Sequence, residues 1–191
     1  MIKDFENEKD AIDVVTESMF SVGFLKDISD CISEGNGDKL TVKNFYDQWS
    51  QQVRPGHIII PFNLGIITSY LYTGILLTKE RWDSLIPDDA TPEALAEWSL
   101  SCVVVTAPMK PAPSVKYIIR RIRNALGHGN IKIDVPEDAV RDQLLEQVKF
   151  ELFDVSRDPA DTFLAVASVK SLIGLVRKLQ SVAHADIRSR Q

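Results

Sequence analysis

The sequence is short of the residues from which several common kinds of functional site are built. It has two cysteines, Cys31 and Cys102, with no spacing that indicates a metal site or a disulfide framework. It also lacks a glycine-rich phosphate loop, a cluster of histidines, cysteines and carboxylates at metal-ligand spacing, and a nucleophile elbow. We therefore expect neither a metal nor a cofactor. The scarcity of cysteine and the acidic start, MIKDFENEKDAID, favour a reducing, cytoplasmic location over secretion.

The chain is acidic on either side of one segment that carries a net positive charge. The net charge is −5 at pH 7, so non-specific coating of nucleic acid is not expected. Residues 98–133 nevertheless carry six basic side chains and no acidic one. A solvated helix face usually mixes both signs of charge, and this segment does not.

A run without charge, IIIPFNLGIITSYLYTGILL at residues 58–77, is long enough to cross a membrane. It contains Pro61, Asn63 and two glycines, and no basic cluster flanks it to set an orientation. We therefore expect a buried helix opened by Pro61 rather than a membrane span.

The apolar spacing predicts a mainly helical chain that forms a single domain over residues 1–191. Ser114 and Thr91 are predicted to cap the helices that follow them. Two segments that alternate apolar and polar residues are predicted to form strands. The expected helices cover residues 5–32, 42–53, 62–84, 92–105, 115–127, 136–147 and 165–185, and the expected strands cover 130–135 and 148–155.

The basic segment contains a helix with two distinct faces, ending in RNALGHG at residues 123–129. At about 100° per residue, the apolar side chains of residues 115–126 share one face. The opposite face gathers Arg123, Asn124 and His128 with Lys116, Arg120 and Arg121. Arg123 and His128 are too far apart along an ideal helix for direct contact, but both could reach a single phosphate.

This set of side chains matches the chemistry of RNA cleavage without a metal. Arg123 offers a permanently charged planar fork to a phosphodiester and stabilises charge that builds on it. Histidine is the usual side chain for proton transfer near neutral pH, so His128 can remove a proton from a ribose 2′-hydroxyl or give one to a leaving 5′-oxygen. Asn124 can orient the imidazole or the phosphate. DNA lacks the 2′-hydroxyl and would resist this route.

The motif and its setting resemble the HEPN superfamily of nucleotide-binding helical domains. The hallmark of that superfamily is an arginine, often followed by a polar residue, and then a histidine four to six residues on. Arg123, Asn124 and His128 match it, and RNALGHG is followed by a strand-like segment and a last helix, as in many bacterial members. Gly127 departs from the alanine or serine that is common before the histidine. The expected fold is a HEPN-like bundle of four to five helices, with a small β-hairpin or strand pair after the motif helix.

The resemblance implies a metal-independent endoribonuclease of a toxin–antitoxin or anti-phage defence system. It further implies a homodimer in which the Arg/His motifs lie near the interface, with RNA as substrate and an antitoxin or defence protein as a further partner. On this interpretation Arg123, Asn124 and His128 form the catalytic site. Arg120, Arg121 and Lys116 extend the RNA-binding surface.

Other interpretations of the same residues stay open. The chain could be a non-catalytic HEPN-like module that binds a nucleotide or a partner protein. Gly127 and Gly129 could simply end the helix, leaving His128 near its C-terminal carbonyls. A protein anchored to a membrane by residues 58–77 is the third alternative.

Overall fold

The computed structural model describes residues 8–57, 59, 62–77, 81–106, 113–136, 143–155 and 161–190. Within these ranges the chain has seven α-helices and one four-stranded antiparallel sheet. The mainly helical fold with a small sheet after the motif helix is confirmed. Two compact units are present, one formed by Glu8–Ser69 and the other containing Tyr70–Gln191. The single domain over residues 1–191 stays a prediction.

The first unit is built on two helices, α1 (Glu8–Ser33) and α2 (Val42–Val53), joined through a 3₁₀ turn at Gly37–Lys39. The Thr41 side chain caps α2 by accepting a hydrogen bond from the Asn44 backbone. Phe24 of α1 packs edge-on against three aromatic rings, those of Phe45, Tyr46 and Trp49. Both predicted helices, at 5–32 and 42–53, are therefore confirmed to within a few residues.

The predicted buried helix 62–84 is helical from residue 64 to residue 77. Helix α3 covers Leu64–Tyr72 and continues as a π-helical turn over Thr73–Leu77. Leu71 and Ile75 in this stretch are completely buried. Within the described part of the chain, no helix combines the length and hydropathy needed to cross a membrane. Residues 58, 60, 61 and 78–80 lie outside the described residues.

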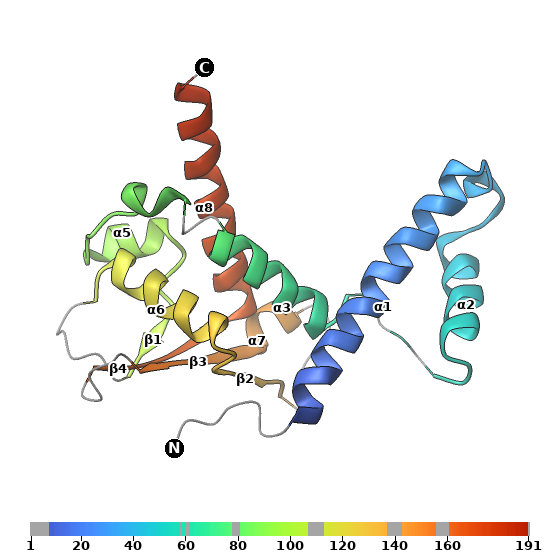
Figure 1. The fold of residues 1–191 in the computed structure, drawn as a ribbon, viewed down its shortest axis with the longest axis horizontal. Coiled ribbons are helices and arrows are strands. Elements are labelled where there is room, and N and C mark those ends of the chain that lie inside the picture. The colour runs from blue at the N-terminus through green and yellow to red at the C-terminus, as the bar shows by residue number, and fades with distance from the viewer. Residues whose placement is uncertain are drawn as a thin grey trace. The chain divides into compact units, whose positions relative to one another are not determined.

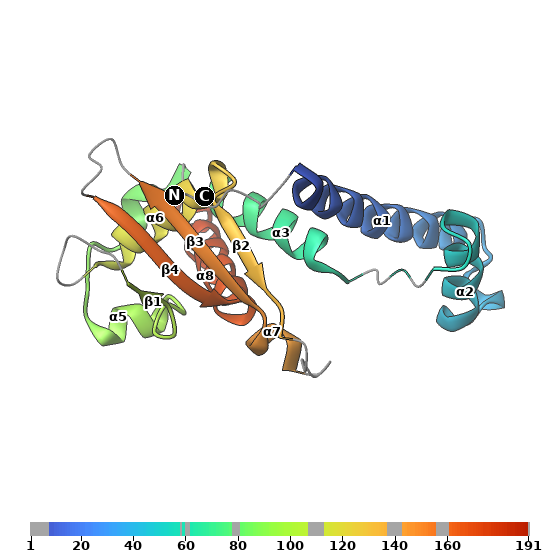
Figure 2. The ribbon, with the colours of Figure 1, turned by 90° about the horizontal axis from the view of Figure 1, so that it is seen from below.

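The second unit contains the sheet, whose strand order is β1-β4-β3-β2 (Figure 2). The strands are β1 (Val104–Val105), β2 (Ile131–Asp134), β3 (Lys149–Val155) and β4 (Thr162–Ser168). Helices α6 (Val115–Gly127) and α8 (Val169–Ser189) lie on the same face of this sheet (Figures 1 and 2). Buried and half-buried positions alternate along β3 and β4, as expected for strands with one face against helices. The sheet and these helices enclose the core around Phe150, Phe163 and Leu172.

Two predicted elements of this unit differ from the structure, and a third is described only at its end. The predicted helix 92–105 ends early: α5 covers only Pro92–Glu97, and Ser99 adopts a left-handed backbone with φ 59°. The β-branched residues that follow then pair with β4 as the edge strand β1. The predicted last helix begins at Val169 instead of 165, because residues 162–168 form β4. Of the predicted helix 136–147, residues 137–142 lie outside the described residues, and α7 (Leu144–Gln147) forms its end.

The two predicted strands after the motif helix are confirmed as neighbours. Ile131 of β2 pairs with Leu152 of β3 in antiparallel register. Both are buried, and the pair lies where β2 begins, shortly after the end of α6. The predicted strand pair is thus half of a wider sheet, since β4 and β1 extend it on the far side of β3.

Candidate functional site

The motif helix α6 begins and ends as its sequence predicts. Ser114 Oγ accepts a hydrogen bond from the Tyr117 backbone at 3.2 Å, which satisfies a free donor of the first turn. Its apolar face is fully packed, with every predicted core position at most 3% exposed: Val115, Ile118, Ile119, Ile122, Ala125 and Leu126. The helix is therefore fixed against the core, and its polar face is held in a defined orientation.

The helix stops in a Schellman motif centred on His128. Gly129 adopts φ 69°, its N–H donates to the Leu126 carbonyl, and the Asn130 N–H donates to the Ala125 carbonyl. The backbone N–H of His128 donates to the Asn124 carbonyl at 3.0 Å. The predicted cap glycine is therefore Gly129, whereas Gly127 is the last helical residue.

The His128 side chain projects from this helix end and is exposed. Among the described residues, the structure gives its ring no hydrogen-bond partner and no ion pair. A histidine in this setting can exchange protons with a bound molecule. Its backbone is fixed by the helix cap.

Arg123 and Asn124 are brought into direct contact. The guanidinium Nη1 of Arg123 donates to Oδ1 of Asn124 at 3.1 Å. The other end of the amide, Nδ2, donates to Oδ2 of Asp154 on β3 at 3.2 Å. Asn124 thus bridges the motif arginine and a carboxylate of the sheet.

Arg121 departs from the expectation that it lies on the exposed face of the helix. Its side chain is 2% exposed, with Nε 2.7 Å from Oδ2 of Asp154 and Nη1 2.8 Å from Oδ2 of Asp161. Its Nη2 also donates to the backbone carbonyls of Asp154 and Asp161. A buried arginine with two carboxylates ties α6 to the sheet and is not accessible to RNA.

Tyr117 completes this group, which we call the anchor cluster: Tyr117, Arg121, Asp154 and Asp161. The Tyr117 hydroxyl donates to Oδ1 of Asp161 at 3.3 Å, and its ring lies 5.6 Å from the Arg121 guanidinium carbon. Burial raises the pKa of the Tyr117 hydroxyl above its usual value, although the nearby Arg121 charge opposes the shift. The tyrosine therefore stays protonated and remains a donor at neutral pH.

The two other predicted RNA-binding residues lie on the surface. Arg120 is exposed, with its guanidinium carbon 5.6 Å from the Tyr117 ring. Lys116 is half-buried, and its amine lies 3.2 Å from a carboxylate oxygen of Asp83. Arg120 is therefore the more accessible cation of the two.

Sequence reasoning missed Asp154, although a signal for it was present. Val148, Phe150 and Leu152 occupy the buried positions of the strand, and Asp154 continues that alternation and is 3% exposed. An acidic residue at a position that the pattern assigns to the core requires a buried partner. Asp161 carried no comparable signal, because it lies just before β4, outside any periodic element.

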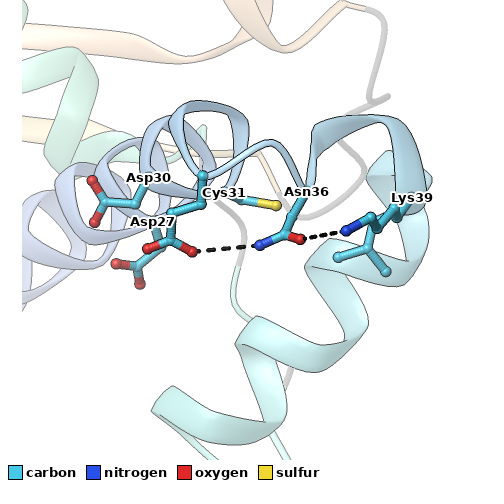
Figure 3. A pocket seen from close by; sticks show the side chains of 7 residues that line it. Asp27, Asp30, Cys31, Asn36 and Lys39 are labelled. Carbon is cyan, nitrogen blue, oxygen red and sulfur yellow. Dashed lines mark hydrogen bonds between the residues drawn. The ribbon is translucent and has the colours of Figure 1, made fainter.

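A separate cavity lies in the first unit beside α1 and the 3₁₀ turn, with a volume of about 410 Å³. Figure 3 shows Asp27 and Asp30 on its wall, with Asn36 accepting a hydrogen bond from Lys39 at 3.1 Å. Glu34 adds a third carboxylate to the lining. Such a lining repels phosphate groups, so this cavity does not suit RNA.

Comparison with known proteins agrees with the motif. A family model described as HEPN pEK499 p136 matches residues 6–190, a range that includes Arg123, Asn124 and His128. No curated protein and no solved structure matches the chain. The resemblance to HEPN domains is confirmed by the family match, which covers nearly the whole sequence. The chain belongs to the HEPN pEK499 p136 family.

Proposed function

We propose that the protein is a metal-independent endoribonuclease that cleaves RNA by attack of a ribose 2′-hydroxyl on the adjacent phosphate. The proposal is supported first by the family, because HEPN domains are often ribonucleases. The observation that carries it is His128, an exposed imidazole at a rigid helix end, one helical turn beyond an arginine–asparagine pair. The attack forms a bond from O2′ to phosphorus and breaks the bond from phosphorus to O5′, leaving a 2′,3′-cyclic phosphate and a free 5′-hydroxyl.

In this reaction the Arg123 guanidinium binds the phosphate and stabilises its extra negative charge in the transition state. His128 serves as the general acid or base, taking the 2′-proton or protonating the leaving 5′-oxygen. Asn124 orients Arg123. Arg120 and Lys116 extend the RNA-binding surface, whereas we leave the buried Arg121 out of it.

A homodimer belongs to the same proposal, with the Arg/His motifs of two chains near the interface. A second imidazole would let one histidine act as the base and the other as the acid. An antitoxin or another defence protein is the partner that such a ribonuclease would require in the cell. Sedimentation of the purified protein, alone and with RNA, measures the oligomeric state.

The experiment is RNA cleavage in EDTA by the wild type, His128→Ala and Arg123→Ala. His184→Ala and Arg177→Ala are the matched controls, because both residues are exposed on α8. We expect wild type and controls to cut a structured RNA to 2′,3′-cyclic phosphate ends and to leave the DNA of the same sequence intact. We expect both motif variants to be inactive while folded.

Folded wild-type protein that is inert on several RNAs would contradict catalysis and favour the non-catalytic module. Titration with labelled RNA and with nucleotides would then test binding. Cleavage by His128→Ala at the wild-type rate would instead place the activity elsewhere.

A further inference from the structure

The anchor cluster holds more negative charge than Arg121 needs. Asp161 alone can neutralise the Arg121 guanidinium, which it meets at 2.8 Å, and two backbone carbonyls satisfy further N–H groups. Asp154 adds a second carboxylate that is 3% exposed. Burying a carboxylate is unfavourable unless its contacts compensate, so Asp154 requires an explanation beyond pairing Arg121.

The contact that distinguishes Asp154 from Asp161 is the hydrogen bond from Asn124. One oxygen of Asp154, Oδ2, lies 2.7 Å from Arg121 Nε in an ion pair and accepts a hydrogen bond from Asn124 Nδ2 at 3.2 Å. Asp161 meets Arg121 and Tyr117 instead. Asp154 is therefore the residue of the anchor cluster whose carboxylate accepts a hydrogen bond from the motif.

A carboxylate at this place determines which way round the Asn124 amide lies. An ionised carboxylate only accepts hydrogen bonds, so it can face the NH₂ end of the amide but not its oxygen. With Nδ2 turned to Asp154, the oxygen Oδ1 points to Arg123 Nη1 and accepts from it at 3.1 Å. A flipped amide would place the Asn124 oxygen against the Asp154 oxygen and the Asn124 NH₂ group against the Arg123 N–H groups. Neither pair could form a hydrogen bond.

We propose that Asp154 is a positioning residue which, through Asn124, fixes the orientation of the Arg123 guanidinium for phosphate binding. That the orientation of Arg123 serves phosphate binding rests on the proposed ribonuclease function. Asp154 itself touches no substrate. Its effect is to hold Arg123 in place before RNA arrives, which lowers the reorganisation needed in the transition state.

The test compares Asp154→Asn with Asp161→Asn, a matched pair because each removes one negative charge beside Arg121. Asparagine at 154 has an NH₂ group that can donate, so it no longer excludes the flipped Asn124 amide. We expect Asp154→Asn to lower kcat by about 10- to 100-fold with KM changed less than threefold. We expect Asp161→Asn to stay within about threefold of the wild-type kcat.

A double-mutant cycle with Asn124→Ala asks whether Asp154 acts through Asn124. We expect Asp154→Asn to cause no further loss of kcat once Asn124 is removed, because the orienting path is already broken. Independent losses that multiply would overturn the inference. Equal losses in Asp154→Asn and Asp161→Asn would also overturn it, since both would then report weakening of the anchor cluster alone.

A readout without catalysis separates this inference from the proposed function. In ¹⁵N-labelled protein, we expect the side-chain amide protons of Asn124 to exchange slowly with solvent in wild type and Asp161→Asn, and rapidly in Asp154→Asn. We also expect the Arg123 side-chain signals to shift only in Asp154→Asn. If the wild type is inactive but Asp154→Asn shows these changes, the proposed ribonuclease function is contradicted and the positioning by Asp154 is not. Unchanged signals in Asp154→Asn would overturn the positioning by Asp154, with or without activity.

Discussion

The side-chain amide of Asn124 on α6 donates a hydrogen bond to Oδ2 of Asp154 on β3, 30 residues further along the chain. The bond makes the sheet part of the site, because the partner of the motif asparagine lies on a buried strand position. A helix that carried the same motif without β3 would lack this acceptor for the Asn124 amide group. The short sequence motif is therefore only the exposed part of a larger arrangement.

Replacing Arg121 is expected to destabilise the fold far more than replacing its neighbour. Arg121→Met leaves Asp154 and Asp161 without their cation, and removing one partner of a buried ion pair typically costs about 3–5 kcal/mol. Arg120→Met is the matched control, because that side chain is exposed and its effect should stay within about 0.5 kcal/mol. Urea unfolding followed by circular dichroism measures both. Similar losses in the two variants would contradict the anchoring by Arg121.

The two glycines beside His128 are expected to respond to alanine in opposite directions. Gly127→Ala should stabilise the protein by about 0.5–1 kcal/mol, because the residue is helical and a new Cβ would lie 3.7 Å from the Leu76 side chain, an ordinary van der Waals contact. Gly129→Ala should destabilise it by about 1–2 kcal/mol, since φ 69° is unfavourable for a residue with a Cβ. Thermal unfolding of the two variants tests the difference in sign. A loss in Gly127→Ala equal to that in Gly129→Ala would disprove the assignment of the cap.

Stability is expected to fall in alkaline solution partly through Tyr117. Its pKa is raised in the folded chain by burial, so the unfolded chain loses the phenol proton at lower pH. The folded state then binds more protons than the unfolded state above about pH 10, and the free energy of unfolding decreases as pH rises through that range. Tyr117→Phe should flatten this decrease. In that variant a part of the decrease should remain, because burial also raises the pKa of Tyr72. Denaturant midpoints of wild type and variant between pH 8 and 11 give the comparison, and identical profiles would refute the prediction.

His128→Ala is expected to leave the fold intact. The side chain is exposed, and the cap is made by the backbone of residues 124–130, so the free energy of unfolding should change by less than about 0.5 kcal/mol. The same denaturation measurement checks this, and it must precede any statement about loss of activity. A loss above about 2 kcal/mol would assign the imidazole to the structure instead of to chemistry.

The sequence predicted the motif helix closely because its signals are local. Ser114 marks its start, a glycine marks its end and the apolar side chains share one face. Strand β4 was missed because its alanines are good helix formers, yet Ala165 and Ala167 pair with β3 and lie buried against the helices. The tertiary pairing outweighed the local propensity there.

Only those residues of the site that belong to one helix could be predicted from the sequence. Arg121 lies at the border between the polar and apolar faces, where helical geometry does not decide between solvent and core. Its place is decided by Asp154 and Asp161, which come from β3 and from just before β4. Partners so distant in the chain leave no periodic signal, apart from the charged residue at the buried position of β3.

The Schellman motif at the end of α6 makes the local fold independent of which side chain occupies position 128. The backbone alone shapes the loop at His128, so a change of side chain there can abolish a reaction without a loss of folding. In a ribonuclease of the proposed kind, a single substitution at His128 would therefore remove the reaction and leave the fold in place.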